Sequence, residues 1–339
     1  MKVSLHIKFL TICLAGIAAI TQLSSCQMNS DGDISKNLDI NKELRSEIGL
    51  INDQLYKAIA KKDMMAIKGL MSDSLLEKLN ESFTQIIGNM SQFYGSGKYK
   101  LLDEYHINNS EIGKNLVLSS GDKGKHSYTI NFPITSKNHY LALVLPEMEF
   151  NGIMMSVFYS KTDAGWKINN LQFGQYSIMS LAAPDFLEKA MNAYGKGYWI
   201  DALNYADIAR ICSRPCNEFM LYINDSLYSS FADKVLKEVK SKYVLPMTIG
   251  EDKNGPELFR INADQYGNEV CPMVWYKTAI PLKDTGALRT EFESSKVLIY
   301  DKFTGLNKDK KHVIYRIYNT LPSASTEPEY KTIIDELPQ

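Results

Sequence analysis

The run Asp103-Glu104-Tyr105-His106 is the densest group of ionisable side chains near the sheet that the sequence predicts. Carboxylates, imidazoles and phenols are the groups that enzymes use to move protons at neutral pH. One interpretation places Asp103 and His106 inside a pocket as a general acid and a general base, together with Tyr128 from a later strand. The other is the solvated end of a strand, which we favour because charged side chains usually lie in water.

The histidines and the glycine-rich turn form no recognisable catalytic or metal motif. His106, His126, His139 and His312 each lack a second histidine three or four places on and a cysteine nearby, so no zinc site is expected. The run Gly95-Ser96-Gly97-Lys98 lacks the glycine spacing of a phosphate-binding loop, and neither G-x-S-x-G nor G-x-G-x-x-G occurs. The sequence therefore points to no catalytic residue, no cofactor and no metal.

Hydrophobic periodicity predicts that helices precede this group. Apolar residues recur every three or four places over 44–59, as in an amphipathic helix, and Lys61-Lys62-Asp63 interrupts the stripe. Two further helical stretches are expected, one around 67–71 and one over 75–90. A stretch of this kind packs its apolar face against a sheet.

The pattern then changes to the period of two that a half-buried strand requires. Residues 128–134 alternate, 140–145 and 153–159 are further strands, and a short turn leads to a strand over 166–173. In that last strand the apolar phase shifts at Asn169-Asn170, which predicts a β-bulge. Helices followed by a bent antiparallel sheet predict an α+β domain over 43–180.

The second half of the chain is expected to hold a helical segment over 184–243 and a small α+β domain over 244–322. In the latter, strands at 258–263 and 270–280 flank a turn at Gly267, a helix capped by Asp284 or Thr285 follows, and 313–318 completes a β-β-α-β unit. A polar tether over 26–42 and a tail over 323–339 are expected to be loose.

Leu23-Ser24-Ser25-Cys26 closes an uncharged apolar run that follows Lys2 and Lys8. A basic start with an apolar core of about 12 residues is typical of a secretory signal peptide, and a spanning helix needs about 20. The run resembles a bacterial lipobox, which implies that residues 1–25 are removed and that Cys26 carries lipid at the membrane. Gln27 in place of Asp implies the outer membrane. The acidic residues that follow are similar to those of Bacteroidota lipoproteins, and a periplasmic or surface orientation stays open.

Composition limits partners and crosslinks. The formal net charge of −1 gives no electrostatic argument for nucleic acid as a partner. With Cys13 removed and Cys26 lipidated, three cysteines remain, and an odd number forms no complete disulfide framework. Cys212 and Cys216 lie four places apart around Pro215, so a disulfide between them and buried reduced thiols both suit an exported protein.

Two stretches of the α+β domain resemble a known family. The segment LYKAIAKKDMMAIKGLMS (55–72) resembles the opening of nuclear transport factor 2-like domains, where two helices joined by a Lys/Gly-Asp turn precede a curved sheet. The strand GWKINNLQF (165–173) looks like the last strand of that fold. The resemblance implies a cone-shaped pocket, which in the isomerases and dehydratases of this class carries Asp, His or Tyr.

A second resemblance lies in the helical segment over 186–215. Gly197-x-Trp199-x-x-Ala202, with Ala209 seven places on, resembles the middle of a tetratricopeptide repeat, although Ala190 stands where the first glycine belongs. Small residues at these places let two helices cross closely. Because roughly three repeats are needed for stability, a single unit implies a helical hairpin between two domains and argues against a peptide-binding array.

These features predict a lipid-anchored cell-envelope protein that binds a protein or a small ligand without catalysis. The alternative is an isomerase- or dehydratase-type enzyme, which would need Asp103, His106 or Tyr128 inside a closed cone. An assembly factor is a third possibility and would show a large apolar patch on the helical hairpin. The positions of these side chains distinguish the three.

Overall fold

The computed structural model describes residues 33–95, 97–148, 150–250, 255–323, 326 and 328–338, which belong to one compact unit. Its strands are β1 (Asp33–Lys36), β2 (Tyr99–Asn108), β3 (Asn115–Ser119), β4 (Tyr128–Pro133), β5 (Asn138–Pro146), β6 (Gly152–Thr162), β7 (Gly165–Ile178), β8 (Leu181–Ala182), β9 (Met220–Tyr222), β10 (Met247–Thr248), β11 (Glu257–Tyr266), β12 (Glu269–Lys277), β13 (His312–Tyr318) and β14 (Tyr330–Glu336). Its α-helices are α1 (Lys42–Lys61), α2 (Met64–Gly69), α3 (Asp73–Leu76), α4 (Glu81–Met90), α5 (Ala183–Gly195), α6 (Trp199–Cys212), α7 (Asp225–Lys242) and α8 (Thr285–Lys302).

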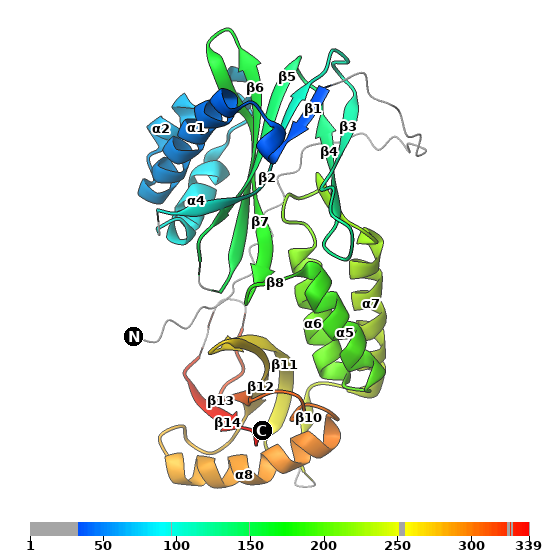
Figure 1. Cartoon of the computed structure of the whole chain (residues 1–339). Helices are drawn as coiled ribbons and strands as arrows, with labels where there is room; N and C mark the ends of the chain where they lie inside the picture. Colours follow the sequence, from blue (N-terminus) through cyan, green and yellow to red (C-terminus); the bar gives the residue numbers. More distant parts are fainter. Residues whose placement is uncertain are drawn as a thin grey trace. The chain divides into compact units, whose positions relative to one another are not determined.

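The strands form three sheets, and the predicted α+β class is confirmed (Figure 1). Sheet A has the order β1-β2-β5-β6-β7-β8, sheet B the order β3-β4-β9 and sheet C the order β10-β11-β12-β13-β14. Sheet A is antiparallel throughout and curled, with helices packed on one face. The helical segment α5–α7 follows it, and sheet C with α8 makes up the C-terminal domain.

The N-terminal helices follow the predicted hydrophobic stripe. Helix α1 begins after Asn41, whose side chain accepts a hydrogen bond from the backbone N–H of Leu44, and ends at Lys62 in the left-handed region with φ +57°. The interruption predicted at 61–63 is therefore confirmed. The third predicted stretch is divided into two helices, α3 and α4, by the non-helical residues 77–80.

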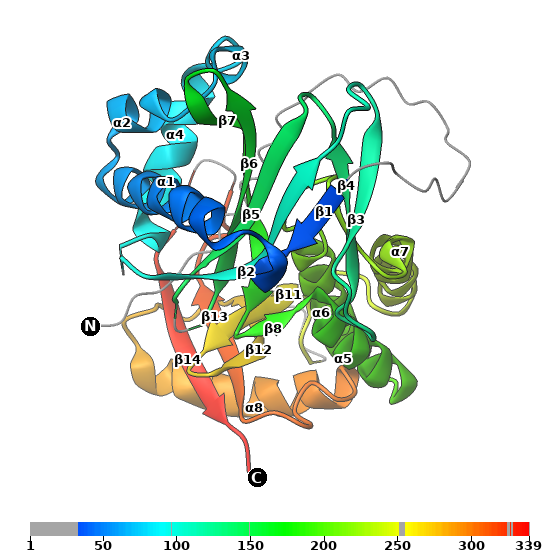
Figure 2. The same cartoon turned by 45° about the horizontal axis from the view of Figure 1, so that its top comes forward.

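Sheet A is covered on both faces because its central strands are apolar on both parities. Tyr140, Ala142 and Val144 of β5 pack in the core with α1, whereas Leu141 and Leu143 pack in the core with sheet B. Figure 2 shows α1, α2 and α4 on one side of sheet A and β3 and β4 on the other. Any polar side chain in the middle of this sheet is therefore enclosed by protein.

The β6–β7 hairpin has the bulge that the sequence predicts. Phe158 pairs with Asn170 and Tyr159 with Ile168, which leaves Asn169 as the extra residue. The short turn that the sequence predicts consists of Asp163 and Ala164, because Thr162 and Gly165 already pair.

The predicted tether over 26–42 is partly wrong. Asp33–Lys36 forms β1, which pairs antiparallel with β2 at the edge of sheet A, and a 3-10 turn over Asn37–Asp39 leads into α1. The four residues of β1, of which only Ile34 is apolar, give no periodicity from which a strand could be predicted. The pairing comes from the partner strand β2 and from side-chain contacts described below.

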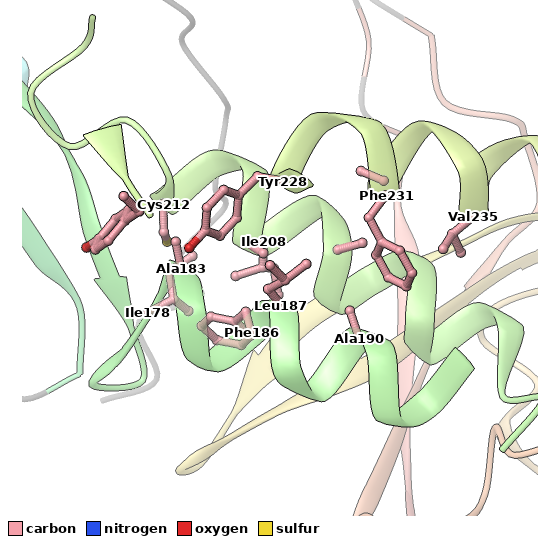
Figure 3. Close-up of a cluster of buried hydrophobic side chains, with 14 of the residues drawn as sticks. Ile178, Ala183, Phe186, Leu187, Ala190, Ile208, Cys212, Tyr228, Phe231 and Val235 are labelled. Atoms are coloured by element: carbon pink, nitrogen blue, oxygen red, sulfur yellow. The ribbon is translucent and has the colours of Figure 1, made fainter. Parts of the chain in front are cut away.

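The helical segment is a hairpin with a third helix packed on it. Helices α5 and α6 meet at a turn where Gly197 has φ +74°, and Ala190, Ala202 and Ala209 are fully buried, as close helix crossing requires. In Figure 3, Leu187 of α5, Ile208 of α6 and Phe231 of α7 point toward one another. Between α6 and α7 the short strand β9 pairs with β4, a connection that the helical pattern did not predict.

Sheet A approaches the loop after α6 so closely that one position of β7 admits no side chain. A Cβ atom built at Gly174 would lie 2.5 Å from the carbonyl oxygen of Pro215 and 2.8 Å from its carbonyl carbon. We expect Gly174→Ala to lower the free energy of unfolding by about 2–3 kcal/mol, because backbone must shift to make room. Gly88→Ala in α4, where nothing lies within 4 Å, should be neutral or stabilising. Urea denaturation of both variants tests this, and equal stabilities would contradict it.

The C-terminal domain contains the predicted β-β-α-β unit and extends it. Asp284 caps α8 by accepting from the N–H of Ala287, and α8 crosses between the parallel strands β12 and β13. The expectation of a loose tail over 323–339 is wrong for 330–336, which forms β14 antiparallel to β13. Asp335 anchors this strand to α8, where it accepts hydrogen bonds from Lys296 at 3.0 Å and Tyr300 at 2.5 Å.

Candidate functional site

Asp103 and Glu104 are both buried in sheet A, with 6% and 3% of their surface exposed. The register between β2 and β5 shifts between Leu101 and Asp103, and beyond it the two carboxylates point to opposite faces. Asp103 lies on the face covered by sheet B, and Glu104 lies on the face covered by α1. The interpretation of this run as a solvated strand end is therefore wrong.

Asp103 is saturated by hydrogen-bond donors. Its carboxylate accepts from Asn37 Nδ2 at 2.7 Å, from Lys36 Nζ at 2.8 Å and from the hydroxyls of Tyr128 and, at 3.4 Å, Tyr105. Burial raises the pKa of Tyr128 above its usual value, so this phenol stays neutral and donates. Asp103 and Tyr128 are thus brought together, as the enzyme interpretation required, but protein groups occupy the carboxylate.

Glu104 has its own set of partners on the other face. Arg45 of α1 holds it through Nε and Nη2 at 3.0 Å each, and the Tyr140 hydroxyl donates to it at 2.5 Å. Burial, with this hydrogen bond, raises the pKa of Tyr140. Both cations, Lys36 and Arg45, come from the N-terminal segment. Sequence reasoning missed them because no local spacing links them to β2.

Asn37 connects the two halves of this arrangement. Its side-chain amide donates to Asp103, and its side-chain oxygen accepts from the backbone N–H of Glu104 at 2.8 Å. It adopts φ +51°, a left-handed conformation that asparagine tolerates better than most residues. We call the group Lys36, Asn37, Asp103, Tyr105 and Tyr128 the β1 clamp.

His106 does not join Asp103. It lies on the α1 face of β2, its ring centroid 6.3 Å from that of Trp166, while the Asp103 carboxylate lies on the sheet B face. Burial lowers the pKa of His106. The acid–base pair proposed from the sequence is therefore not assembled, because a strand with a period of two separates these positions.

Aromatic side chains fill the space between α1 and sheet A. Tyr56 lies 5.0 Å from Tyr94 and 5.1 Å from Tyr99 between ring centroids, and Tyr159 donates to Asn52 Oδ1 at 2.6 Å. Beside Tyr99 opens a shallow cleft of about 500 Å³, whose lining residues are Asp53, Gly97, Lys98, Tyr99, Leu101 and Glu147. The interior of the curled sheet thus holds packing and internal hydrogen bonds.

His139 is a fully buried histidine that closes the turn before β5. Its Nε2 accepts from the backbone N–H groups of Thr135 and Ser136 at 3.0 Å each, so the proton lies on Nδ1, which is 3.2 Å from the carbonyl oxygen of Tyr159. Burial lowers the pKa of His139, although the backbone bonds oppose this shift. The residue is a neutral structural group.

This neutral histidine predicts a pH dependence of stability. Below a pH of about 6.5 an unfolded histidine binds a proton that folded His139 does not bind, so the free energy of unfolding falls from pH 7 to pH 5. We expect His139→Gln to be less stable than wild type but to lose less stability over this range. Part of the pH dependence of stability should remain in this variant, because burial also lowers the pKa of His106. Exposed His126→Gln is the control, and an unchanged slope in His139→Gln would contradict the assignment.

The cysteines of the helical segment do not form the disulfide that the sequence left open. Cys212 and Cys216 are free thiols, both fully buried in the apolar core, and burial raises the pKa of each to about 12. Cys271 is likewise free and buried. The alternative of buried reduced thiols describes the structure.

A charged cleft of about 680 Å³ lies in the C-terminal domain, and its lining residues are Glu269, Asn307, Lys308, Asp309, Lys310, Lys311, Leu337 and Pro338. Lys310 is buried and bonds Asp201 of α6 at 2.7 Å. Lys308 and Lys311 are exposed, and no ion pair of theirs occurs within the described part of the chain. Their ammonium groups face solvent at the edge of the cleft.

The sequence also led to expectations about a metal site, a membrane-spanning helix and a lipid anchor. Within the described ranges, no three His, Cys, Asp or Glu side chains gather as metal ligands, and no helix has both the length and the apolar character to cross a bilayer. The lipobox and Cys26 lie outside the residues that the structure describes.

Comparison of the chain with protein-family models, with curated proteins and with solved structures finds no match.

Proposed function

We propose that this protein is a lipid-anchored cell-envelope protein whose folded part binds a protein or a small ligand without catalysis. The observation that carries the non-catalytic part is the saturation of Asp103 and Glu104. Each carboxylate has a cation and at least one tyrosine hydroxyl as partners, and each is enclosed by packed side chains. A general acid or base must reach the proton that it transfers, and these groups face protein.

The enzyme alternative is weakened by the same geometry. An isomerase- or dehydratase-type site would need Asp103, His106 or Tyr128 in one open cone, whereas His106 lies across the strand from the other two. The order of helices followed by a curled sheet is the order that the resemblance to nuclear transport factor 2-like domains implies. The pocket that this resemblance implies would need Asp103, His106 and Tyr128 to face one another, and His106 lies on the opposite face of β2.

The anchor part of the proposal rests on the lipobox. Mass spectrometry of the N-terminal peptide of protein purified from membranes should show cleavage after Ser25 and a lipid-sized mass on Cys26. Cys26→Ser should abolish both. An unmodified Cys26, or cleavage at another site, would reject the anchor and leave the binding proposal standing.

The binding part points to the charged cleft in the C-terminal domain. Exposed Lys308 and Lys311 offer cations to an acidic protein surface or an anionic ligand. Crosslinking in native membranes should capture a partner with wild type and with Lys302→Ala/Lys331→Ala, a control pair of exposed lysines. It should capture less with Lys308→Ala/Lys311→Ala. Equal capture by all three proteins would reject this cleft as the binding surface.

A further inference from the structure

The distance along the chain between the lipid attachment and the folded body is short. Six residues separate Cys26 from Asp33, the first residue of β1. Seven extended Cα steps span at most about 25 Å. If Cys26 carries lipid, the start of β1 lies within that distance of the bilayer surface.

The β1 clamp keeps this start of the body in place. Lys36 Nζ bonds both the Asp103 carboxylate and the carbonyl oxygen of Ser120, and Asn37 bonds Asp103 and the backbone of Glu104. Peeling β1 from sheet A would leave the carboxylate of Asp103 buried without its cation, which is costly. The segment that links the lipid to the folded body therefore ends at Asp33, where β1 begins, and not at the start of α1.

Strand register shows which end of sheet A carries this attachment. Asp33 pairs with Asn108, and Asn108 with Asn138, so the start of β1 lies at one end together with the loops that follow β2 and precede β5. We call this the anchor end and define it by Asp33, Asn108, Lys137 and the exposed Ile112 of the β2–β3 loop. Figure 1 shows the start of β1 at the same end of sheet A as the start of β5 and the end of β6.

The C-terminal domain contacts the opposite end. There Tyr99 pairs with Pro146, and Asn151 in the loop after β5 donates to Gln265 of β11 at 3.4 Å. From Tyr99 to Asn108, β2 alone spans about 30 Å at the usual rise per residue. Figure 1 shows α8 on the far side of the C-terminal domain from sheet A.

We infer that the lipidated protein stands on the membrane with the anchor end beside the bilayer and with the C-terminal domain farthest from it. This inference rests on the proposed lipidation of Cys26. The anchor end offers a headgroup layer one apolar side chain, Ile112, which is 55% exposed, and one exposed cation, Lys137, beside the exposed carboxylate of Asp33. The orientation holds the C-terminal domain, which contains the charged cleft, at a distance from the lipid where a partner can reach it.

Energy transfer to the membrane tests this orientation. Lys137→Cys places a label at the anchor end, and Val297→Cys places one on α8, where Val297 is 54% exposed. The native Cys212, Cys216 and Cys271 are buried and should stay unlabelled. Lipidated proteins are reconstituted in phosphatidylethanolamine–phosphatidylglycerol vesicles with a headgroup acceptor. The Förster distance should be near the length of β2, about 30 Å.

We expect strong transfer from position 137 and little from position 297. A 20-residue Gly/Ser insertion between Ser30 and Asp31 should lower the transfer at 137 and reduce its difference from 297, since a longer flexible linker lets the body turn. Equal transfer from both positions, or stronger transfer from 297, would overturn the orientation while the anchor stands. Absence of lipid on Cys26 in the mass spectrum would instead reject the anchor part of the proposed function, on which this orientation rests.

Discussion

Replacing Asp103 by asparagine should lower the free energy of unfolding by about 2–3 kcal/mol. The substitution keeps the shape but removes the charge that balances Lys36 and the acceptor that the Tyr128 hydroxyl uses. The expected cost lies below that of a fully buried pair because Lys36 is partly exposed. Urea denaturation of the purified protein measures it.

The same variant should loosen β1 before it unfolds the body. Hydrogen exchange at β1 amides should accelerate in Asp103→Asn, whereas the central strands β5 and β6 should stay protected. Asp163→Asn, at an exposed carboxylate in the β6–β7 turn, is the matched control and should leave both measurements unchanged. If Asp103→Asn matches wild type in stability and exchange, the clamp has been misassigned.

Replacing Lys310 by methionine should lower the free energy of unfolding by about 3–5 kcal/mol, the largest effect that we expect. Lys310 and Asp201 are 3% and 7% exposed, and Lys310 also donates to the carbonyl oxygens of Gly305 and Lys308 at 2.7 Å each. Without the ammonium group, the Asp201 carboxylate stays buried and uncompensated. Thermal or urea unfolding of the purified protein measures the loss.

The pH dependence identifies Asp201 as the cause. Burial raises the pKa of Asp201, and the charge of Lys310 opposes this shift, so Lys310→Met should raise it further. The unfolded carboxyl ionises near pH 3.9, so the penalty of the variant should grow as the pH rises from there toward neutrality. Asp201→Asn/Lys310→Met should recover much of the stability. A variant whose penalty is the same at pH 4 and pH 7 would show that Asp201 is not responsible.

A surface ion pair nearby provides the comparison. Lys196 bonds Asp309 at 2.6 Å, but both side chains are more than half exposed. Exposed pairs contribute little because water screens them and their side chains lose entropy. Lys196→Met should therefore leave stability nearly unchanged, although it removes a lysine from the same interface between helical segment and C-terminal domain.

The Gly305 loop shows why this interface depends on tertiary contacts. Gly305 has φ +86°, and a Cβ atom there would lie 2.2 Å from the ring of Tyr198 in the α5–α6 turn. Locally, Gly305 lies in the turn that follows the end of α8 at Lys302. Its close approach to Tyr198, more than 100 residues earlier, has no local signal.

Elements with strong local patterns were predictable. The apolar stripe of α1, the alternation of β4, the phase shift at Asn169 and the Asp284 cap of α8 each depend on neighbours within a few residues. Strands β1, β3, β9 and β14 were not predicted, because they are short or charged and depend on pairing with another strand. Whether Cys212 and Cys216 form a disulfide could not be predicted, because it depends on how the surrounding core encloses them.

By itself the sequence determined the α+β class and the elements with strong local patterns, such as α1, β4 and the β6–β7 hairpin. The tertiary structure decided what Asp103, Glu104 and His106 do. It enclosed both carboxylates, brought Lys36 and Arg45 to them from some 60 residues away, and separated Asp103 from His106 across a strand. Burial makes an isolated charge costly and therefore demands a partner, and no spacing in the sequence says which residue that partner will be.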